Sequence, residues 1–331
     1  MKAFDAETLR MVAQVDLSTA EMVGRFNDWK LKDGSRAGLM ALLGKAPLPR
    51  DPFKIRGQTA ISVSGGRTSG YMLWRVLQSN GGVLPADTVV FFANTGKERE
   101  ETLEFVRDMG RNWNVPIVWV EFRADAPGYA VVDFETASRD GEPFEAVIRK
   151  RNYLPNPVTR FCTVELKIRT MHKHLKSLGW RDGDGWDQMV GIRADEQRRV
   201  VKIRARPSPE TVMETMVLPL ADAGVTKRDV AAFWNAQPFD LGLRNANGVT
   251  PDGNCDLCFL KGRNQIFTSI KREPGRAVWW AAMEKIELSS KASGAVFRSD
   301  RPSYQQMHDY ALAQQDMFYD EEEGIACFCG D

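Results

Sequence analysis

The chain has 331 residues, 43% of them hydrophobic, which is enough to bury a core in one large domain or two smaller ones. Its 45 lysines and arginines against 44 aspartates and glutamates leave a net charge of +1, so no overall attraction to nucleic acid or membranes is expected. Because the sequence shows no apolar run of membrane-spanning length and no secretion signal, we expect a cytoplasmic protein that does not contact membranes.

Residues 1–56 are predicted to form a helical N-terminal extension. Ser18 and Glu21 have the spacing of a capping box, and the proline-rich segment "KAPLPRDP" follows a run of helix-forming residues. The sequence leaves open whether these helices recognise a substrate or cover the next domain.

Residues 57–225 alternate short apolar runs with amphipathic stretches. "TAISVS" is followed by "SGYMLWRVLQSN", and "DTVVFFANT" by "REETLEFVRDMGRNW" and then "PIVWVEF". This order predicts an α/β fold, with a parallel twisted sheet and helices on both faces. Open sheets of this kind bind ligands beyond the carboxyl ends of their strands, so the residues at those ends are the candidate site.

A glycine-rich turn, "SGGRTS", follows the first predicted strand and precedes a predicted helix. Such a turn directs backbone N–H groups and the positive end of the helix dipole towards one point, where an anion binds. Glycines allow close approach and the hydroxyls add donors, although an ordinary helix start gives a similar pattern. The predicted phosphate cradle consists of Ser64, Gly65, Gly66, Arg67, Thr68 and Ser69.

The second predicted strand ends in "ANTGKE", which we expect beside the first turn. Asn94, Thr95, Gly96 and Glu98 are therefore candidate nucleotide-binding residues. Acidic residues are also common in the first turn of any helix, which is the alternative explanation for the acids that follow.

Two basic stretches lie further along the chain. The helix predicted for "LKIRTMHKHLKSLGW" points lysines and arginines outward, and "RRVVKIRARP" adds a second stretch. Solvated surface charges are the default interpretation; if both stretches line one cleft, a nucleic-acid substrate becomes credible. Lys167 is the candidate contact for phosphate or sulfate, whereas His172 and His174 are expected to be surface residues.

Five cysteines occur as the pairs Cys255/Cys258 and Cys327/Cys329 and the isolated Cys162. The first pair has the spacing of a zinc half-site, a redox pair or two ligands of an iron–sulfur cluster, and spacing alone does not separate these. We expect residues 226–331 to form a smaller C-terminal module whose order depends on what the cysteines hold.

Five segments, in order along residues 57–262, resemble the phosphoadenosine phosphosulfate reductase family. "SGGRTS" is similar to the PP-loop of N-type ATP pyrophosphatases, and the other four to segments of the reductase family: "NTGKEREETLEFV", "RFCTVELK", "GIRADEQRR" and "LPLADAGVTKRDVAAFW". The resemblance implies an adenine nucleotide alpha-hydrolase-like fold with the nucleotide across the carboxyl edge of its sheet. It also implies that Arg193 reaches the phosphate or sulfate end, with a salt bridge to Asp195 or Glu196 as the alternative.

The resemblance further implies metal ligands. Many PP-loops carry an acid where this chain has Thr68, which affects how Mg²⁺ and pyrophosphate would be handled; Glu98 is a candidate substitute. Iron–sulfur members place a cysteine doublet where this chain has Phe161 and Cys162, which implies a [4Fe–4S] cluster, with zinc as the alternative. The implied ligands are Cys162, Cys255, Cys258 and a tail cysteine, Cys327 or Cys329, unless one iron stays open to bind sulfide.

Together these features predict adenine-nucleotide-dependent sulfur chemistry. In the favoured version, ATP adenylates an oxygen of a small or nucleic-acid substrate, and cluster-bound sulfur displaces AMP. One alternative is reduction of an adenylyl sulfate through Cys329, although nearby acids favour a ligand role for that thiol; another is a non-catalytic nucleotide-binding protein with a structural metal. Lys167, Arg193 and Cys329 are the candidate catalytic residues; a sulfur donor or thiol reductant is the expected partner, and the oligomeric state stays open.

Overall fold

The computed structural model describes residues 51–331 except 181–184, 206–213, 247, 289–295 and 314–331. The chain divides into two compact units, Met1–Asp51 and Pro52–Asp331. The predicted N-terminal helices and the tail cysteines Cys327 and Cys329 lie outside the described residues. Of the helices within the described ranges, none combines the length and apolar character needed to traverse a bilayer.

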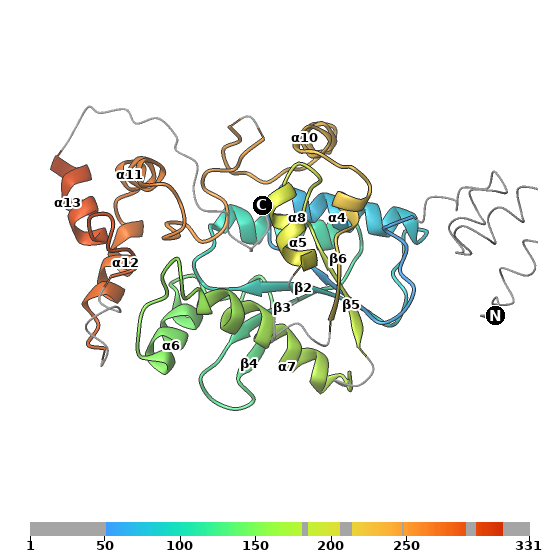
Figure 1. The fold of residues 1–331 in the computed structure, drawn as a ribbon, viewed down its shortest axis with the longest axis horizontal. Coiled ribbons are helices and arrows are strands. Elements are labelled where there is room, and N and C mark those ends of the chain that lie inside the picture. Colours follow the sequence, from blue (N-terminus) through green and yellow to red (C-terminus); the bar gives the residue numbers. More distant parts are fainter. Residues whose placement is uncertain (1–50, 181–184, 206–213, 247, 289–295, 314–331) are drawn as a thin grey trace, which may run out of the picture. The chain divides into compact units, whose positions relative to one another are not determined.

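The second unit is built on a six-stranded sheet with the strand order β4-β3-β2-β1-β5-β6 (Figure 1). All neighbouring strands are parallel except β3 and β4. This arrangement confirms the predicted α/β class, with one added antiparallel edge strand. The strands are β1 (Thr59–Ser62), β2 (Thr88–Asn94), β3 (Ile117–Phe122), β4 (Tyr129–Val132), β5 (Trp186–Val190) and β6 (Glu214–Val217).

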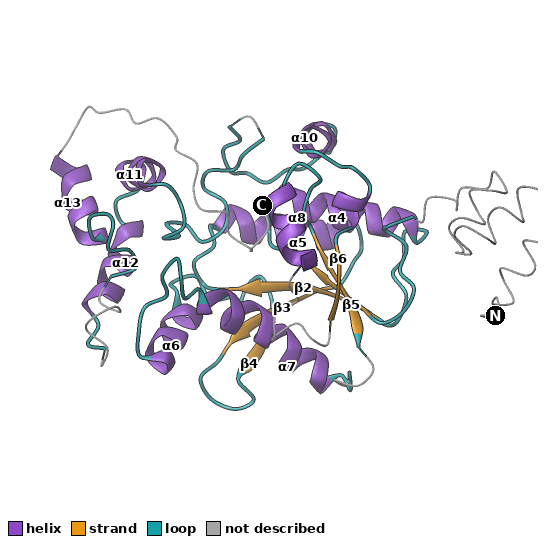
Figure 2. Cartoon of the chain, viewed as in Figure 1, coloured by secondary structure: helices purple, strands orange, loops and turns teal. Residues whose placement is uncertain are grey.

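Helices cover both faces of this sheet, as Figure 2 shows. The helices of the sheet region are α4 (Arg67–Ser79), α5 (Glu100–Asn112), α6 (Glu142–Arg151), the π-helical segment η1 (Thr163–Ile168), α7 (Arg169–Ser177), α8 (Gln197–Ala205), α9 (Pro219–Asp222) and α10 (Lys227–Asn235). Three further helices follow: α11 (Arg263–Arg272), α12 (Arg276–Lys285) and α13 (Tyr304–Ala313).

The two faces of the sheet bury different side chains because successive residues of a strand point in opposite directions. Ile61 and Phe92 join a core with α4, α5 and α10, whereas Ala60 and Phe91 join a second core with α7. A third core combines α6 and the Cys255–Cys258 segment with α11, α12 and α13.

The chain reverses its direction across the sheet at β1, since β2 and β3 lie on one side of it and β5 and β6 on the other. In open parallel sheets, this switch point leaves a crevice at the carboxyl ends of the two central strands. The predicted cradle, which follows β1 directly, therefore lies beside the topological ligand site.

Candidate functional site

The turn between β1 and α4 depends on a glycine in the left-handed region. Gly65 has φ +80°, and a Cβ at this position would lie 2.4 Å from Cγ2 of Thr102. The Oγ of Ser69 accepts a hydrogen bond from the Ser64 amide at 3.1 Å and donates to the Gly66 carbonyl at 3.0 Å. The predicted cradle is thus a closed turn whose shape only glycine at position 65 permits.

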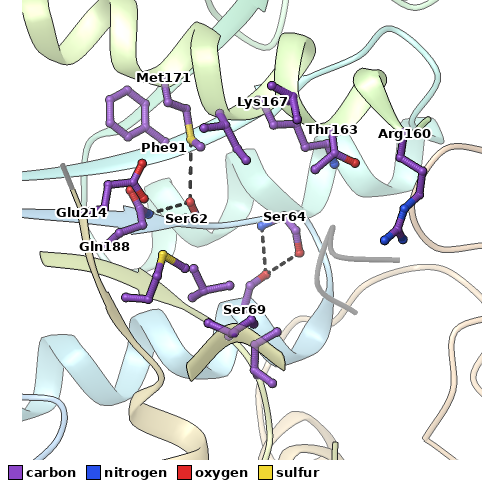
Figure 3. Close-up of a pocket in the computed structure, with 18 of the residues that line it drawn as sticks. Ser62, Ser64, Ser69, Phe91, Arg160, Thr163, Lys167, Met171, Gln188 and Glu214 are labelled. Carbon is purple, nitrogen blue, oxygen red and sulfur yellow. Dashed lines mark hydrogen bonds between the residues drawn. The ribbon is translucent and has the colours of Figure 1, made fainter. Parts of the chain in front are cut away.

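A cavity of about 560 Å³ adjoins this turn (Figure 3). Ser64 and Ser69 form one part of its wall, and β2, β5, β6 and η1 supply much of the rest. Most of the remaining surface is apolar, contributed by Phe91, Met171, Ile192 and similar side chains. Its size is typical of small-molecule sites, and its chemistry suits a ligand with an apolar body and an anionic end.

Polar side chains also line the part of the cavity around β5 and β6. The amide nitrogen of Gln188 donates to Ser62 Oγ at 2.9 Å (Figure 3). Glu214, which also lines the cavity, is hydrogen-bonded to Nε2 of His172. Sequence analysis did not identify Ser62, Gln188 or Glu214. The cavity therefore offers hydrogen-bonding groups away from the cradle as well as at it.

The prediction that the two helix histidines lie on the surface is wrong. His172 is half-buried and paired with Glu214, and the ring of His174 packs edge-on against Phe91 at 5.6 Å. Burial lowers the pKa of His174, because the charged imidazolium loses its hydration there. Both residues lie on the helix face towards the sheet, which a spacing of two residues does not exclude.

Arg193 lies at the cradle. Its Nη1 donates to Thr68 Oγ1 at 2.9 Å and its Nε to Asp195 Oδ1 at 3.0 Å, so the cradle contact and the alternative salt bridge coexist. Gly191 allows this approach, since a Cβ there would lie 3.0 Å from the Cα of Ser69. The structure thus brings two distant predicted segments together and holds the Arg193 guanidinium, with Asp195 and Glu196 as its acidic partners, at the turn.

Arg67 points away from the cavity. Its guanidinium binds both carboxylate oxygens of Asp240, at 2.8 and 2.7 Å, and donates to Thr250 Oγ1 at 2.9 Å. It also donates to the carbonyls of Leu241 and Leu243. This buried guanidinium fastens residues 240–250 to the first turn of α4, and its partners are protein groups.

The loop after β2 turns its polar groups inward. Asn94 donates to Glu121 at 2.6 Å and accepts from the Gly96 amide at 3.1 Å, while Glu98 accepts both the amide and the hydroxyl of Thr95. None of these four predicted residues is among the described residues that line the cavity. Burial raises the pKa of Glu98, against the lowering effect of the Lys167 charge.

The Cys255–Cys258 segment is docked on that same loop. The amide of Asp256 donates to the Lys97 carbonyl at 2.7 Å, and its carboxylate lies 3.4 Å from Lys97 Nζ. Trp280 Nε1 donates to the same carboxylate at 2.8 Å, and Thr95 Oγ1 lies 3.5 Å from Cys255 Sγ. The loop after β2 therefore positions the cysteine pair instead of lining the cavity.

Lys167 links the cysteine pair to the cavity. It lines the cavity from η1, and π-helical turns of this kind are frequent at functional sites. Burial raises the pKa of Cys255 well above its usual value, with further increases from Glu98 and Cys258, while the charge of Lys167 lowers it. The charge of Lys167 thus acts on the Cys255 thiol, and the same side chain forms part of the cavity wall.

Three of the cysteines predicted as metal ligands lie within the described residues. Cys162, Cys255 and Cys258 belong to one hydrophobic cluster, with Cys162 and Cys255 half-buried and Cys258 buried. Within the described ranges, no three histidine, cysteine or acidic side chains gather closely enough to hold a metal ion. The described cysteines therefore do not form a complete ligand set by themselves.

Fold and cavity together define an open-sheet α/β protein with a ligand-sized cavity at its switch point. No family model matches the sequence. Over 225 residues the chain is 30% identical to the uncharacterized nin region protein ORF290 of Escherichia phage lambda, a match that covers 65% of this chain and 70% of the phage protein. The chain belongs to the family of that phage protein.

Proposed function

We propose that the protein binds an adenine nucleotide in the cavity and uses it for sulfur transfer, as the resemblance to the phosphoadenosine phosphosulfate reductase family implies. The observation that carries this proposal is the position of the cavity, which opens directly onto the β1–α4 turn at the switch point of the sheet. Anions bind at such turns because amide donors and the helix dipole converge there.

The two kinds of cavity wall match the two ends of a nucleotide. The phosphates would lie at Ser64 and Ser69, with the guanidinium of Arg193 beside them. A purine ring would lie against the apolar wall, where Phe91 and Ile192 contribute. Gln188 and other polar groups of β5 and β6 are then available to the edge of the base or to the ribose.

The proposed reaction begins with ATP. A substrate oxygen attacks the α-phosphorus, the bond from that phosphorus to the bridging oxygen breaks, and pyrophosphate leaves. Negative charge develops on the phosphate oxygens during this step, so fixed positive charges stabilise the transition state. We propose that Lys167, which lines the cavity, and Arg193, which contacts Thr68 of the turn, supply that charge, and Mg²⁺ would accompany the nucleotide.

In the second step, sulfur replaces AMP on the substrate. A cysteine persulfide, loaded by a sulfur donor, forms a bond through its outer sulfur to the activated atom, and the bond from that atom to the AMP oxygen breaks. The second thiol of the pair then attacks the inner sulfur, the S–S bond breaks and releases the thiolated product, and an external thiol reductant reduces the disulfide that remains. The cysteine pair beside Lys167 is the candidate carrier of this sulfur. Because its pKa is raised, Cys255 carries its proton at neutral pH, and a positive charge nearby favours the thiolate.

Product analysis tests this proposal. The protein is incubated with ATP and sulfide, and separately with adenylyl sulfate and a thiol reductant, while nucleotide binding is followed by calorimetry. We expect ATP to bind and to yield AMP and pyrophosphate, and a variant with Ser64→Ala and Ser69→Ala, which controls for contaminating ATPases, to yield neither.

Three results would contradict the proposal in different ways. Sulfite released from adenylyl sulfate, with ATP inert, would establish the reductase alternative instead. Tight binding of ATP without AMP or pyrophosphate would identify a non-catalytic nucleotide-binding protein. If neither nucleotide binds, the proposal that the β1–α4 turn binds phosphate is rejected.

A further inference from the structure

One segment of this nearly neutral chain carries a marked local excess of positive charge. Residues 149–176 contain eight lysines and arginines and a single acid, Glu165, whereas the whole chain has 45 basic and 44 acidic residues. This imbalance is therefore local. It falls on the last turn of α6, on η1 and on α7, which lie on the same side of the sheet in Figure 1.

The single acid lies between two of the arginines. Arg169 Nη1 is 2.7 Å from Glu165 Oε1, and Arg151 pairs with the same oxygen. Glu165 is buried, while both arginines are exposed. One carboxylate thus joins the end of α6 to the start of α7 and neutralises only part of the charge that it gathers.

Two lysines of this segment lie over the same aromatic ring. Lys150 Nζ lies 5.4 Å and Lys173 Nζ 5.7 Å from the centre of the Phe122 ring, at the end of β3. Burial lowers the pKa of Lys173, and the charge of Lys150 lowers it further. We call Lys150, Arg151, Arg169 and Lys173 the basic face.

Holding like charges together raises the free energy of the folded state, and a bound polyanion removes that cost. Two further cations of residues 149–176 line the cavity. They are Arg160 and Lys167, and Lys167 is two residues before Arg169 in the chain. Tyr153, whose ring packs edge-on against Phe161 at 4.8 Å, adds an aromatic surface to the same wall.

We propose that the basic face binds the sugar–phosphate backbone of single-stranded nucleic acid and leads it to the cavity. Phosphates at regular intervals match a row of cations, and an aromatic ring beside the row is the usual partner of an unstacked base. The role of this strand as the acceptor of activated sulfur rests on the proposed function; the binding itself does not.

The test is the anisotropy of a fluorescein-labelled oligothymidylate, titrated with the full chain at salt concentrations from about 50 to 200 mM. The test variant is Lys150→Gln with Lys173→Gln. The matched control is Lys271→Gln with Lys285→Gln, which removes two exposed lysines from α11 and α12. Unfolding midpoints are measured for all proteins, so that loss of folding is recognised.

We expect the unaltered protein to bind with an affinity that falls as salt rises. The Lys150/Lys173 variant should bind about tenfold more weakly, and its salt slope should be smaller by about 0.7 for each phosphate that the variant leaves without a lysine. The control variant should keep the affinity and the slope of the unaltered protein.

The proposal is overturned if the oligonucleotide does not bind, if both variants bind equally, or if only anionic lipid vesicles are bound. Calorimetry with ATP on the same samples separates the two proposals. If the unaltered protein binds ATP but not the oligonucleotide, only the proposal for the basic face is rejected. Oligonucleotide binding without any adenine-nucleotide binding leaves the basic face and removes the proposed function.

Discussion

Two loops leave the carboxyl edge of the sheet at neighbouring strands and use their polar residues in opposite ways. The β1–α4 turn places Ser64 and Ser69 on the cavity wall. The loop from β2 to α5 is equally polar, but its side chains are buried and contact protein groups: Thr95, Lys97, Glu98 and Arg99.

The second loop holds the C-terminal part of the chain. Lys97 pairs with Asp256, and Arg99 pairs with Glu273 and lies 3.6 Å from Asp252. Lys97, Arg99, Asp252 and Asp256 are buried, so removing one of them weakens the compensation of a buried charge. Two loops at the same edge of the sheet therefore differ in role: the β1–α4 turn forms part of the cavity wall, and the loop from β2 to α5 positions the cysteine pair.

The largest effect should come from the glycine of the first loop. In Gly65→Ala the new methyl would lie 2.4 Å from Thr102 Cγ2, so the turn has to move. We expect ATP binding to weaken by at least about a hundredfold, because the hydrogen-bond donors of the turn and the N-terminal end of α4 are displaced. Calorimetry measures this loss.

Gly81→Ala is the matched control, since Gly81 also has φ +80° but nothing lies within 4 Å of its Cβ position. It should cost about 1 kcal/mol of stability and leave ATP binding unchanged. Equal ATP affinity in the two variants would contradict the importance of the turn's shape.

The second loop should be vulnerable through stability instead of binding. Lys97→Met leaves Asp256 buried without its lysine, and we expect the free energy of unfolding to fall by about 3 kcal/mol. The exposed pair of Arg149 with Glu145 is the control, and Arg149→Met should cost less than about 0.5 kcal/mol. Urea unfolding measures both; similar losses would show that the buried pair does not fasten the C-terminal segment.

A smaller effect is expected from one hydroxyl of the turn. Ser69→Ala removes hydrogen bonds to Ser64 and Gly66. This loss should lower the free energy of unfolding by about 1 kcal/mol and weaken the binding of ATP about tenfold. Ser303→Ala removes a comparable bond, which Ser303 Oγ accepts from the Gln306 amide at 3.2 Å, away from the cavity. It should lose similar stability and no affinity; a loss of ATP affinity there would mean that affinity only follows stability.

The smallest effect concerns pH. The pKa of His174 is lowered by burial, so the unfolded chain binds a proton more readily than the folded one. Its contribution to stability is therefore present above about pH 6.5 and lost as pH falls towards the folded-state pKa. His174→Gln should flatten the decrease in thermal midpoint between neutral and mildly acidic pH.

The His174 effect is measured as a difference between variant and unaltered protein, because other groups titrate as well. The raised pKa of Glu98 works in the opposite direction, since the folded state takes up that proton more readily as pH falls. Parallel curves for the two proteins would show that His174 does not contribute.

The sequence predicted the features that depend on neighbouring residues. The alternation of apolar runs and amphipathic stretches is local, as is the strand, glycine turn and helix around Gly65, and the structure contains both. The resemblance implied that Arg193 reaches the phosphate or sulfate end of a nucleotide, and in the structure its guanidinium contacts Thr68 of the turn. The contact with a nucleotide stays a prediction. The cysteine ligand set stays a prediction, because its tail members lie outside the described residues.

Features that depend on distant residues were missed for a physical reason. The direction of Arg67 is decided by Asp240, and that of the loop after β2 by Asp256, neither of which is near in sequence. The pairing of His172 with Glu214 likewise crosses from α7 to β6. No signal in the sequence singled out Glu214, because its partner is 42 residues away along the chain.

The central claim, that the β1–α4 turn grips the phosphates of a nucleotide, is tested most directly by a crystal structure with a non-hydrolysable ATP analogue. The account predicts phosphate oxygens within hydrogen-bond distance of Ser64 and Ser69, and the purine ring against the apolar wall that Phe91 and Ile192 help to form. An analogue bound elsewhere, with the turn empty at saturating concentration, would contradict it.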